Sequence, residues 1–179
     1  MTRRGGILAL DLSSHVGWAW GITGDAAPVS GVWELPSVAD LGRRFAAFEN
    51  ELLDAFDRYQ PAVVSMEAPL PASQQTHAYS AELQIGLAAI TECSCYRWEK
   101  PLYRRASGTV RAGVLGTARF PKGEAKKAVM AWCQARGWRF ADHNAADALL
   151  VWAYEAGIRA ARSKPAQTVP VLGRPGPVV

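Results

Sequence analysis

Three acidic residues lie in or beside short apolar segments, where an uncompensated charge is costly. Asp11 interrupts the run ILALDL, Glu67 ends the run PAVVSME, and Asp147 stands among alanines and leucines in NAADALL. Any one of them alone could be a structural acid held by a hydrogen bond or a salt bridge. Together they favour a hard cation such as Mg²⁺, which prefers oxygen ligands. Two such ions could activate a water and stabilise the leaving oxygen of a phosphodiester.

The residues just before Asp147 could supply a fourth group. Asn144 and His143 lie three and four residues before it, so on a helix both can face the same way. Asn144 could ligate a metal through its carbonyl oxygen, and His143 could be a ligand or a general base. Asp142 is rotated off that face. We interpret it as the N-cap of the helix, with a direct role at the metal as the alternative, and the sequence leaves the fourth group open.

The elements that must position these carboxylates follow from the hydrophobic pattern. It predicts strands at 7–13, 16–22, 29–35, 61–67 and 101–105, and helices at 40–59, 80–96, 122–136 and 142–161. Three strands in tight succession favour an antiparallel meander, and the later alternation favours parallel strands. The expected fold is therefore α/β, with a mixed five-stranded sheet flanked by helices. The first strand and 61–67 should lie side by side at the sheet centre, so that Asp11 and Glu67 meet. We interpret 104–124 as a basic, glycine-punctuated connection.

The bulk composition indicates one globular domain. The chain has 179 residues, of which 49% are hydrophobic and 20% charged. We expect the domain to span 1–162 and a flexible Pro/Gly-rich tail to occupy 163–179. No apolar stretch approaches the roughly 18 residues of a membrane span. Three cysteines without zinc spacing favour reduced thiols and a cytoplasmic location.

Basic residues gather between positions 104 and 127, and the net charge is +4. A charge run is usually a solvated face. Next to an acidic site suited to phosphodiesters, however, it predicts contacts with nucleic-acid phosphates. We place Lys126 nearest the scissile phosphate. The candidate DNA-binding residues are Arg104, Arg105, Arg111, Arg119, Lys122, Lys126 and Lys127.

Four segments in this order resemble the sequence blocks of RuvC-type Holliday junction resolvases, especially the shorter phage and prophage members. ALDLSSHVGWAW carries Asp11 and the Gly-Trp-Ala that follows, VVSMEAP carries Glu67, and DHNAADALLVWA carries the Ala-Asp-Ala around Asp147. In the fourth segment, Arg111, Gly116 and Lys126 match residues that contact DNA or the active site in the family. The match spans about residues 7 to 155.

The resemblance implies a ribonuclease H-like fold and the activity of a resolvase. Asp11, Glu67 and Asp147, with Asn144, would hold two Mg²⁺ or Mn²⁺ ions, and His143 and Lys126 would take part in catalysis. The partner implied is a four-way DNA junction. A homodimer would present two active sites to it and make paired cuts that leave 5′-phosphate and 3′-hydroxyl ends. The protein would act in the cytoplasm of a bacterium or be encoded by a phage.

Three positions depart from the family pattern. Leu12-Ser13 replaces a Pro-Gly after Asp11, Asn144 stands where many relatives have aspartate or histidine, and Leu70 replaces a phenylalanine near the junction centre. The sequence is also compatible with three alternative functions. They are a non-catalytic protein that binds branched DNA, a nuclease acting on flaps, forks or RNA, and a phosphate-binding fold like that of actin-like ATPases and sugar kinases.

Overall fold

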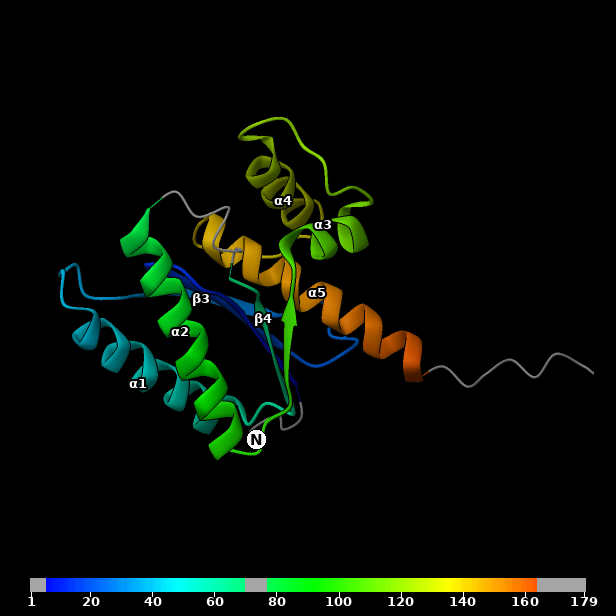
Figure 1. The fold of residues 1–179 in the computed structure, drawn as a ribbon. Coiled ribbons are helices and arrows are strands. Elements are labelled where there is room, and N and C mark those ends of the chain that lie inside the picture. The colour runs from blue at the N-terminus through cyan, green and yellow to red at the C-terminus, as the bar shows by residue number, and fades with distance from the viewer. Residues whose placement is uncertain (1–5, 70–76, 164–179) are drawn as a thin grey trace, which may run out of the picture.

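The structure, a computed structural model, describes residues 6–69 and 77–163 (Figure 1). The strands are β1 (Ile7–Asp11), β2 (His15–Gly21), β3 (Val29–Glu34), β4 (Val63–Glu67) and β5 (Leu102–Arg105). The helices are α1 (Leu41–Tyr59), α2 (Ala78–Arg97), α3 (Ser107–Leu115), α4 (Glu124–Ala135) and α5 (His143–Ser163).

The strands form one mixed sheet in the order β3-β2-β1-β4-β5. The pairs β1–β2 and β2–β3 are antiparallel, whereas β1–β4 and β4–β5 are parallel. The predicted α/β fold, with a meander of three strands followed by parallel strands, is therefore confirmed. The expected central pairing of β1 with β4 is confirmed as well.

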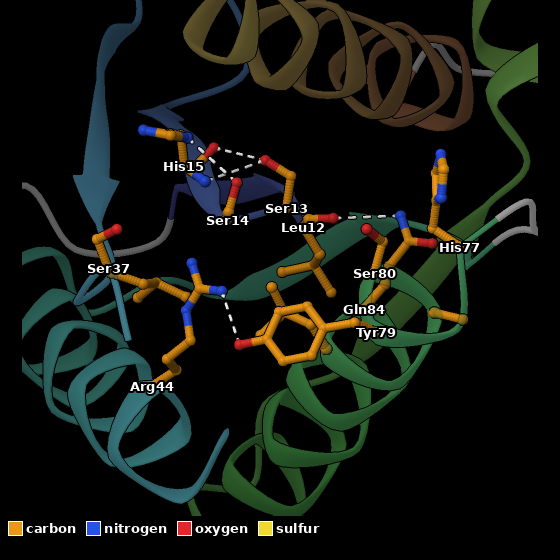
Figure 2. A pocket seen from close by; sticks show the side chains of 13 residues that line it. Leu12, Ser13, Ser14, His15, Ser37, Arg44, His77, Tyr79, Ser80 and Gln84 are labelled. Carbon is orange, nitrogen blue, oxygen red and sulfur yellow. Dashed lines mark hydrogen bonds between the residues drawn. The ribbon is translucent and has the colours of Figure 1, made fainter. Parts of the chain in front are cut away.

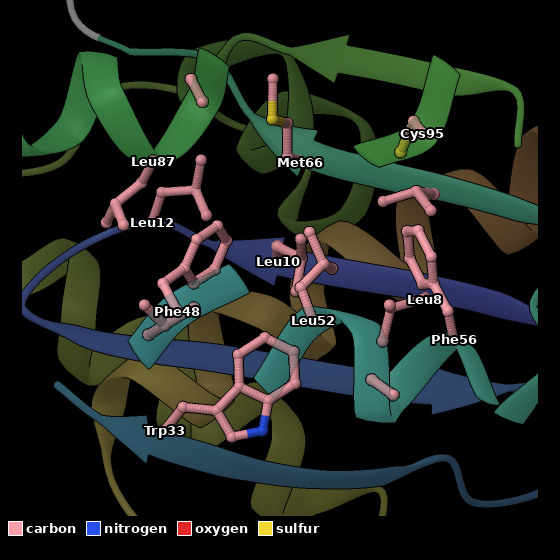
Figure 3. Close-up of a cluster of buried hydrophobic side chains, with 14 of the residues drawn as sticks. Leu8, Leu10, Leu12, Trp33, Phe48, Leu52, Phe56, Met66, Leu87 and Cys95 are labelled. Carbon is pink, nitrogen blue, oxygen red and sulfur yellow. The ribbon is translucent and has the colours of Figure 1, made fainter. Parts of the chain in front are cut away.

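Helices cover both faces of the sheet. Helices α1 and α2 lie over one face, and α5 lies across the other, with α3 and α4 beyond it (Figure 1). Successive side chains of β1 point to opposite faces: Leu8 and Leu10 join the cluster around Phe48 (Figure 3), and Ile7 and Ala9 join the cluster under α5. All four are at most 2% exposed, which explains why β1 is a continuous apolar run.

The prediction of an irregular connection over 104–124 is wrong in its middle part, where Ser107–Leu115 form α3. The glycines misled the interpretation because they serve packing and termination. A Cβ on Gly113 would lie 2.5 Å from a ring carbon of Tyr154, so this glycine lets α3 pack closely on α5. Gly116, with φ of 78°, ends the helix in the left-handed conformation that favours glycine.

Two earlier predictions fall outside the part of the chain that the structure describes. These are the role of Leu70 and, beyond Ser163, the flexible tail, so the boundary between domain and tail stays a prediction. Within the described residues, no helix is both long and apolar enough to span a bilayer.

Candidate active site

Asp11 and Glu67 lie next to each other at one edge of the sheet. Leu10 of β1 pairs with Met66 of β4 in parallel register, and each acid is the following residue on its strand. Since both strands run in the same direction, their last residues reach the same carboxyl edge. The two side chains therefore leave the sheet on neighbouring strands, as the sequence predicted.

The third acid reaches this edge because α5 begins against β2. Gly17 of β2 pairs with Asp11, and a Cβ on Gly17 would lie 2.0 Å from the backbone oxygen of Asn144. Only glycine permits this approach. It brings the first turns of α5, which carry Asp147, over the end of β1.

Asp142 caps α5. The N–H groups of Asn144 and Ala145 donate to Asp142 Oδ1, at 2.9 and 3.0 Å, which confirms the N-cap interpretation. Burial works to raise the pKa of Asp142, but these bonds, together with one from the Asn144 side chain, hold it below its usual value. The cap fixes where the helix begins and hence where Asp147 stands.

The three carboxylates share one electrostatic environment. Burial, followed by the negative charges of Glu67 and Asp147, raises the pKa of Asp11 well above its usual value. Burial likewise raises the pKa of Glu67, with Asp147 adding to the effect, and it raises the pKa of Asp147. Like charges held together out of water disfavour the ionised form. The cluster is thus a site of concentrated, poorly compensated negative charge.

Two basic side chains and one hydroxyl on α3 and α4 stabilise the ionised form of the acids in this cluster. Arg111 of α3 lowers the pKa of all three acids, and Lys126 of α4 lowers those of Asp11 and Asp147. The Ser107 side chain hydrogen-bonds to Glu67 and stabilises its charge. Sequence reasoning missed Ser107, because its position at the start of a helix was hidden once 104–124 was interpreted as a connection.

The two candidates for a fourth active-site group, His143 and Asn144, have different surroundings at the start of α5. The charge of His143 acts on Asp147 and on Asp142. Asn144 is buried, and its Nδ2 donates to Asp142 Oδ2 at 2.7 Å. The structure therefore places His143 near the acidic cluster and ties the Asn144 amide to the helix cap.

The predicted DNA-binding residues divide into two groups. Arg104 pairs with Glu92, Lys127 with Glu124, and Arg105 with Glu155 of α5, whose side chain is 1% exposed. Arg119 and Lys122, in contrast, are exposed between α3 and α4 and form no ion pair with another described residue. Together with Arg111 and Lys126, they are the basic residues of this region whose charge is not taken up by an acid in an ion pair.

The chemistry of the donor set fits a hard divalent cation. Asp11, Glu67 and Asp147 present carboxylate oxygens, and none of them forms an ion pair with another described residue. A cation would relieve the repulsion that raises their pKa values. Within the described residues, no three His, Cys, Asp or Glu side chains stand close enough to hold one ion together. The carboxylates thus border the sheet edge without forming a closed coordination shell.

No protein-family model matches the sequence, and no curated protein matches it either. Solved structures do share the fold. RuvC of T. thermophilus in complex with a Holliday junction substrate is 16% identical with a TM-score of 0.69, over 90% of this chain and 99% of that one. A second Thermus thermophilus RuvC structure is 18% identical with a TM-score of 0.64, over 89% and 99%. The yeast mitochondrial Holliday junction resolvase Ydc2 is 12% identical with a TM-score of 0.61, over 89% and 81%.

The sheet order and the helices on both faces form an α/β fold of the ribonuclease H-like type. More particularly, its fold is that of the RuvC-type resolvases, which it matches over most of its length. The resemblance inferred from the sequence blocks is thereby confirmed at the level of the fold.

Proposed function

We propose that the protein is a metal-dependent endonuclease that resolves four-way DNA junctions. The observation that carries the proposal is the meeting of Asp11, Glu67 and Asp147 at one sheet edge, with Arg111 and Lys126 acting on them. Carboxylates that hold metal ions, flanked by basic side chains that attract a phosphate, are suited to phosphodiester hydrolysis. The fold shared with RuvC, one structure of which contains a Holliday junction substrate, supports branched DNA as the substrate class.

The side chains have separable roles in this proposal. Asp11, Glu67 and Asp147 would hold two Mg²⁺ or Mn²⁺ ions, which when bound activate a water and stabilise the leaving oxygen. Lys126 and Arg111 attract the scissile phosphate and offset its charge. Ser107 holds Glu67 by its hydrogen bond. His143, whose charge acts on Asp147, would serve as a further ligand or as a general base.

Paired cuts across a junction call for two active sites, so we propose a homodimer. Support comes from α2, where residues spaced four, four and three positions apart form one exposed helical face. Its members are Ile85, Ala89, Cys93 and Tyr96, with Ile85 53% and Tyr96 87% exposed. Large apolar side chains exposed along one face are typical of an association surface.

The test is cleavage of a labelled synthetic four-way junction with Mg²⁺, Mn²⁺ or EDTA. We expect symmetric paired nicks that need the metal and are lost in Asp11→Asn. Asp54→Asn, an exposed carboxylate of α1, is the matched control and should cleave normally. Tight binding without cleavage by the wild type would instead indicate a non-catalytic junction-binding protein. Faster cleavage of flaps, forks or RNA than of the junction would reassign the substrate.

A further inference from the structure

A pocket opens at the carboxyl end of β1, on the α1–α2 face of the sheet (Figure 2). Its volume is about 590 Å³, within the range of roughly 300–1,000 Å³ that is typical of ligand sites. The turn between β1 and β2, the start of α1 and the start of α2 form its walls. Leu12 and Ser13, which follow Asp11 directly, are part of the lining. The pocket therefore lies at the same carboxyl end of β1 as Asp11.

Arg44 is the decisive group in this pocket. Its residue is only 8% exposed, yet it forms no ion pair with any described acid. Nη1 donates to Tyr79 Oη at 3.1 Å, and Nε has no hydrogen-bond partner. Tyr79 in turn donates to the backbone oxygen of Val38 at 3.1 Å. A buried guanidinium without a counter-charge is destabilising, and an anion in the pocket would remove that penalty.

The rest of the lining also suits an anion. No aspartate or glutamate is among the described residues that border the pocket. Helix α2 starts at its rim, and the cap residue His77 makes no side-chain bond to the first-turn amides, which leaves them available to an anion. Beyond Arg44 and Tyr79, the described polar side chains around the pocket are those of Ser13, Ser14, His15, Ser37, His77, Ser80 and Gln84.

We propose that this pocket binds a backbone phosphate of the nucleic acid, next to the strand position that is cut. The inference rests on the proposed function, because the position of the pocket at the end of β1 that carries Asp11 is what favours a nucleic-acid phosphate as the ligand. Arg44 supplies the charge. The hydroxyls and the amides at the start of α2 supply directional donors. Such a contact fixes the register of the DNA on the protein and carries no base specificity.

The experiment compares neighbouring arginines of one helix. Arg44→Gln removes the charge from the pocket, whereas Arg43→Gln removes it from an exposed position outside the lining. Ser80→Asp is a second probe that does not depend on the fit of a buried side chain, because an acid in the first turn of α2 favours the helix while repelling an anion. Melting temperature and sedimentation verify that each variant is folded and assembled as the wild type is. Junction binding is then measured in EDTA over a range of salt concentrations.

We expect Arg44→Gln and Ser80→Asp to weaken junction binding about tenfold or more, since a charge-assisted hydrogen bond is lost. Loss of one phosphate contact should also reduce the slope of log affinity against log salt by about 0.9. Arg43→Gln should change the affinity less than about twofold. Equal effects of the two arginine variants, or unchanged binding by Ser80→Asp, would overturn the assignment while leaving the nuclease proposal intact.

Inorganic phosphate separates failure of the pocket from failure of the proposed function. If the wild type binds no DNA, the function fails, and phosphate is titrated while the amide resonances of Ser80 and Ala81 are followed by NMR. Shifts that are absent in Arg44→Gln would support a phosphate pocket that serves a smaller ligand. No shifts in the wild type would refute the pocket outright.

Discussion

Replacing Asp11 by asparagine should make the metal-free protein more stable, even though it should abolish cleavage. Asp11 lies in a partly buried position, and its pKa is raised well above the usual value by burial and by the charges of Glu67 and Asp147. The folded state therefore pays to keep Asp11 ionised at neutral pH. Asparagine has nearly the same shape and no charge, so it removes both the desolvation penalty and the repulsion.

The size of the effect follows from linkage. Each unit by which the pKa in the folded protein exceeds that in the unfolded chain corresponds to about 1.4 kcal/mol at a pH above both values. For a domain of this size, 1 kcal/mol changes Tm by about 2–4 °C. We therefore expect Asp11→Asn to raise Tm by at least about 3 °C at pH 8 in EDTA. Asp54→Asn, which changes an exposed acid of α1, should leave Tm unchanged.

Divalent metal should reverse this order of stability. At a concentration of about 100 Kd, an ion bound only by the folded state stabilises it by about 2.7 kcal/mol, or roughly 5–11 °C for this chain. The wild type should gain this increment in Mg²⁺, and Asp11→Asn should gain much less. Differential scanning calorimetry in EDTA and in Mg²⁺ measures both effects. A lower Tm of Asp11→Asn in EDTA would refute the reasoning, because the carboxylate would then be a structural acceptor. Equal gains in Mg²⁺ would show that the ion binds elsewhere.

Three further predictions concern the surroundings of the site. The pKa values of all three acids are raised in the folded protein. Their contribution to stability is therefore fully present below a pH of about 4 and is lost as the pH rises through the raised values. Tm measured against pH in EDTA should show this loss, and Mg²⁺ should flatten the curve. Gly17→Ala should destabilise the fold by about 1–3 kcal/mol and slow cleavage, because its Cβ would clash with the backbone of α5. Urea unfolding and the junction assay measure the two effects. An unchanged urea midpoint would show that α5 can move away without loss of stability. Arg105→Ala should destabilise the fold by about 3 kcal/mol, because it leaves buried Glu155 with one fewer partner. Arg104→Ala, which breaks an exposed pair, should change the stability by less than about 1 kcal/mol. Similar losses of stability for both variants in urea would contradict this account.

The sheet and the two strand-end acids were predictable because their signals are local. A strand buried on both faces must be apolar throughout, so an acid at its end stands out in the sequence, as Asp11 and Glu67 do. Asp147 was predictable for the same reason on a helix of small and apolar residues. Asp142 was recognisable as a cap from its position alone.

The features that escaped prediction depend on contacts between distant segments. Gly113 belongs to the segment interpreted as a glycine-punctuated connection, and only its close approach to Tyr154 explains the glycine. The hydrogen bond from Ser107 to Glu67 joins the start of α3 to the end of β4. Arg44 lies on a helix that packs against α2, and its burial is visible only once the two helices are placed together. Composition and spacing carry no information on such pairs.

The fold itself explains why charge accumulates at one point of this molecule. Parallel pairing of β1 with β4 brings the carboxyl ends of two strands, and with them Asp11 and Glu67, to the same edge, and Gly17 lets α5 add a third acid there. Two of the basic residues in the 104–127 segment, Arg111 and Lys126, act on the acids without forming an ion pair with another described residue. The cluster thus stays under-neutralised, which weakens the isolated fold but leaves the carboxylates available. In the proposed function, cations and a phosphodiester would complete the charge of this site, and the metal-dependent stability measurement tests that dependence.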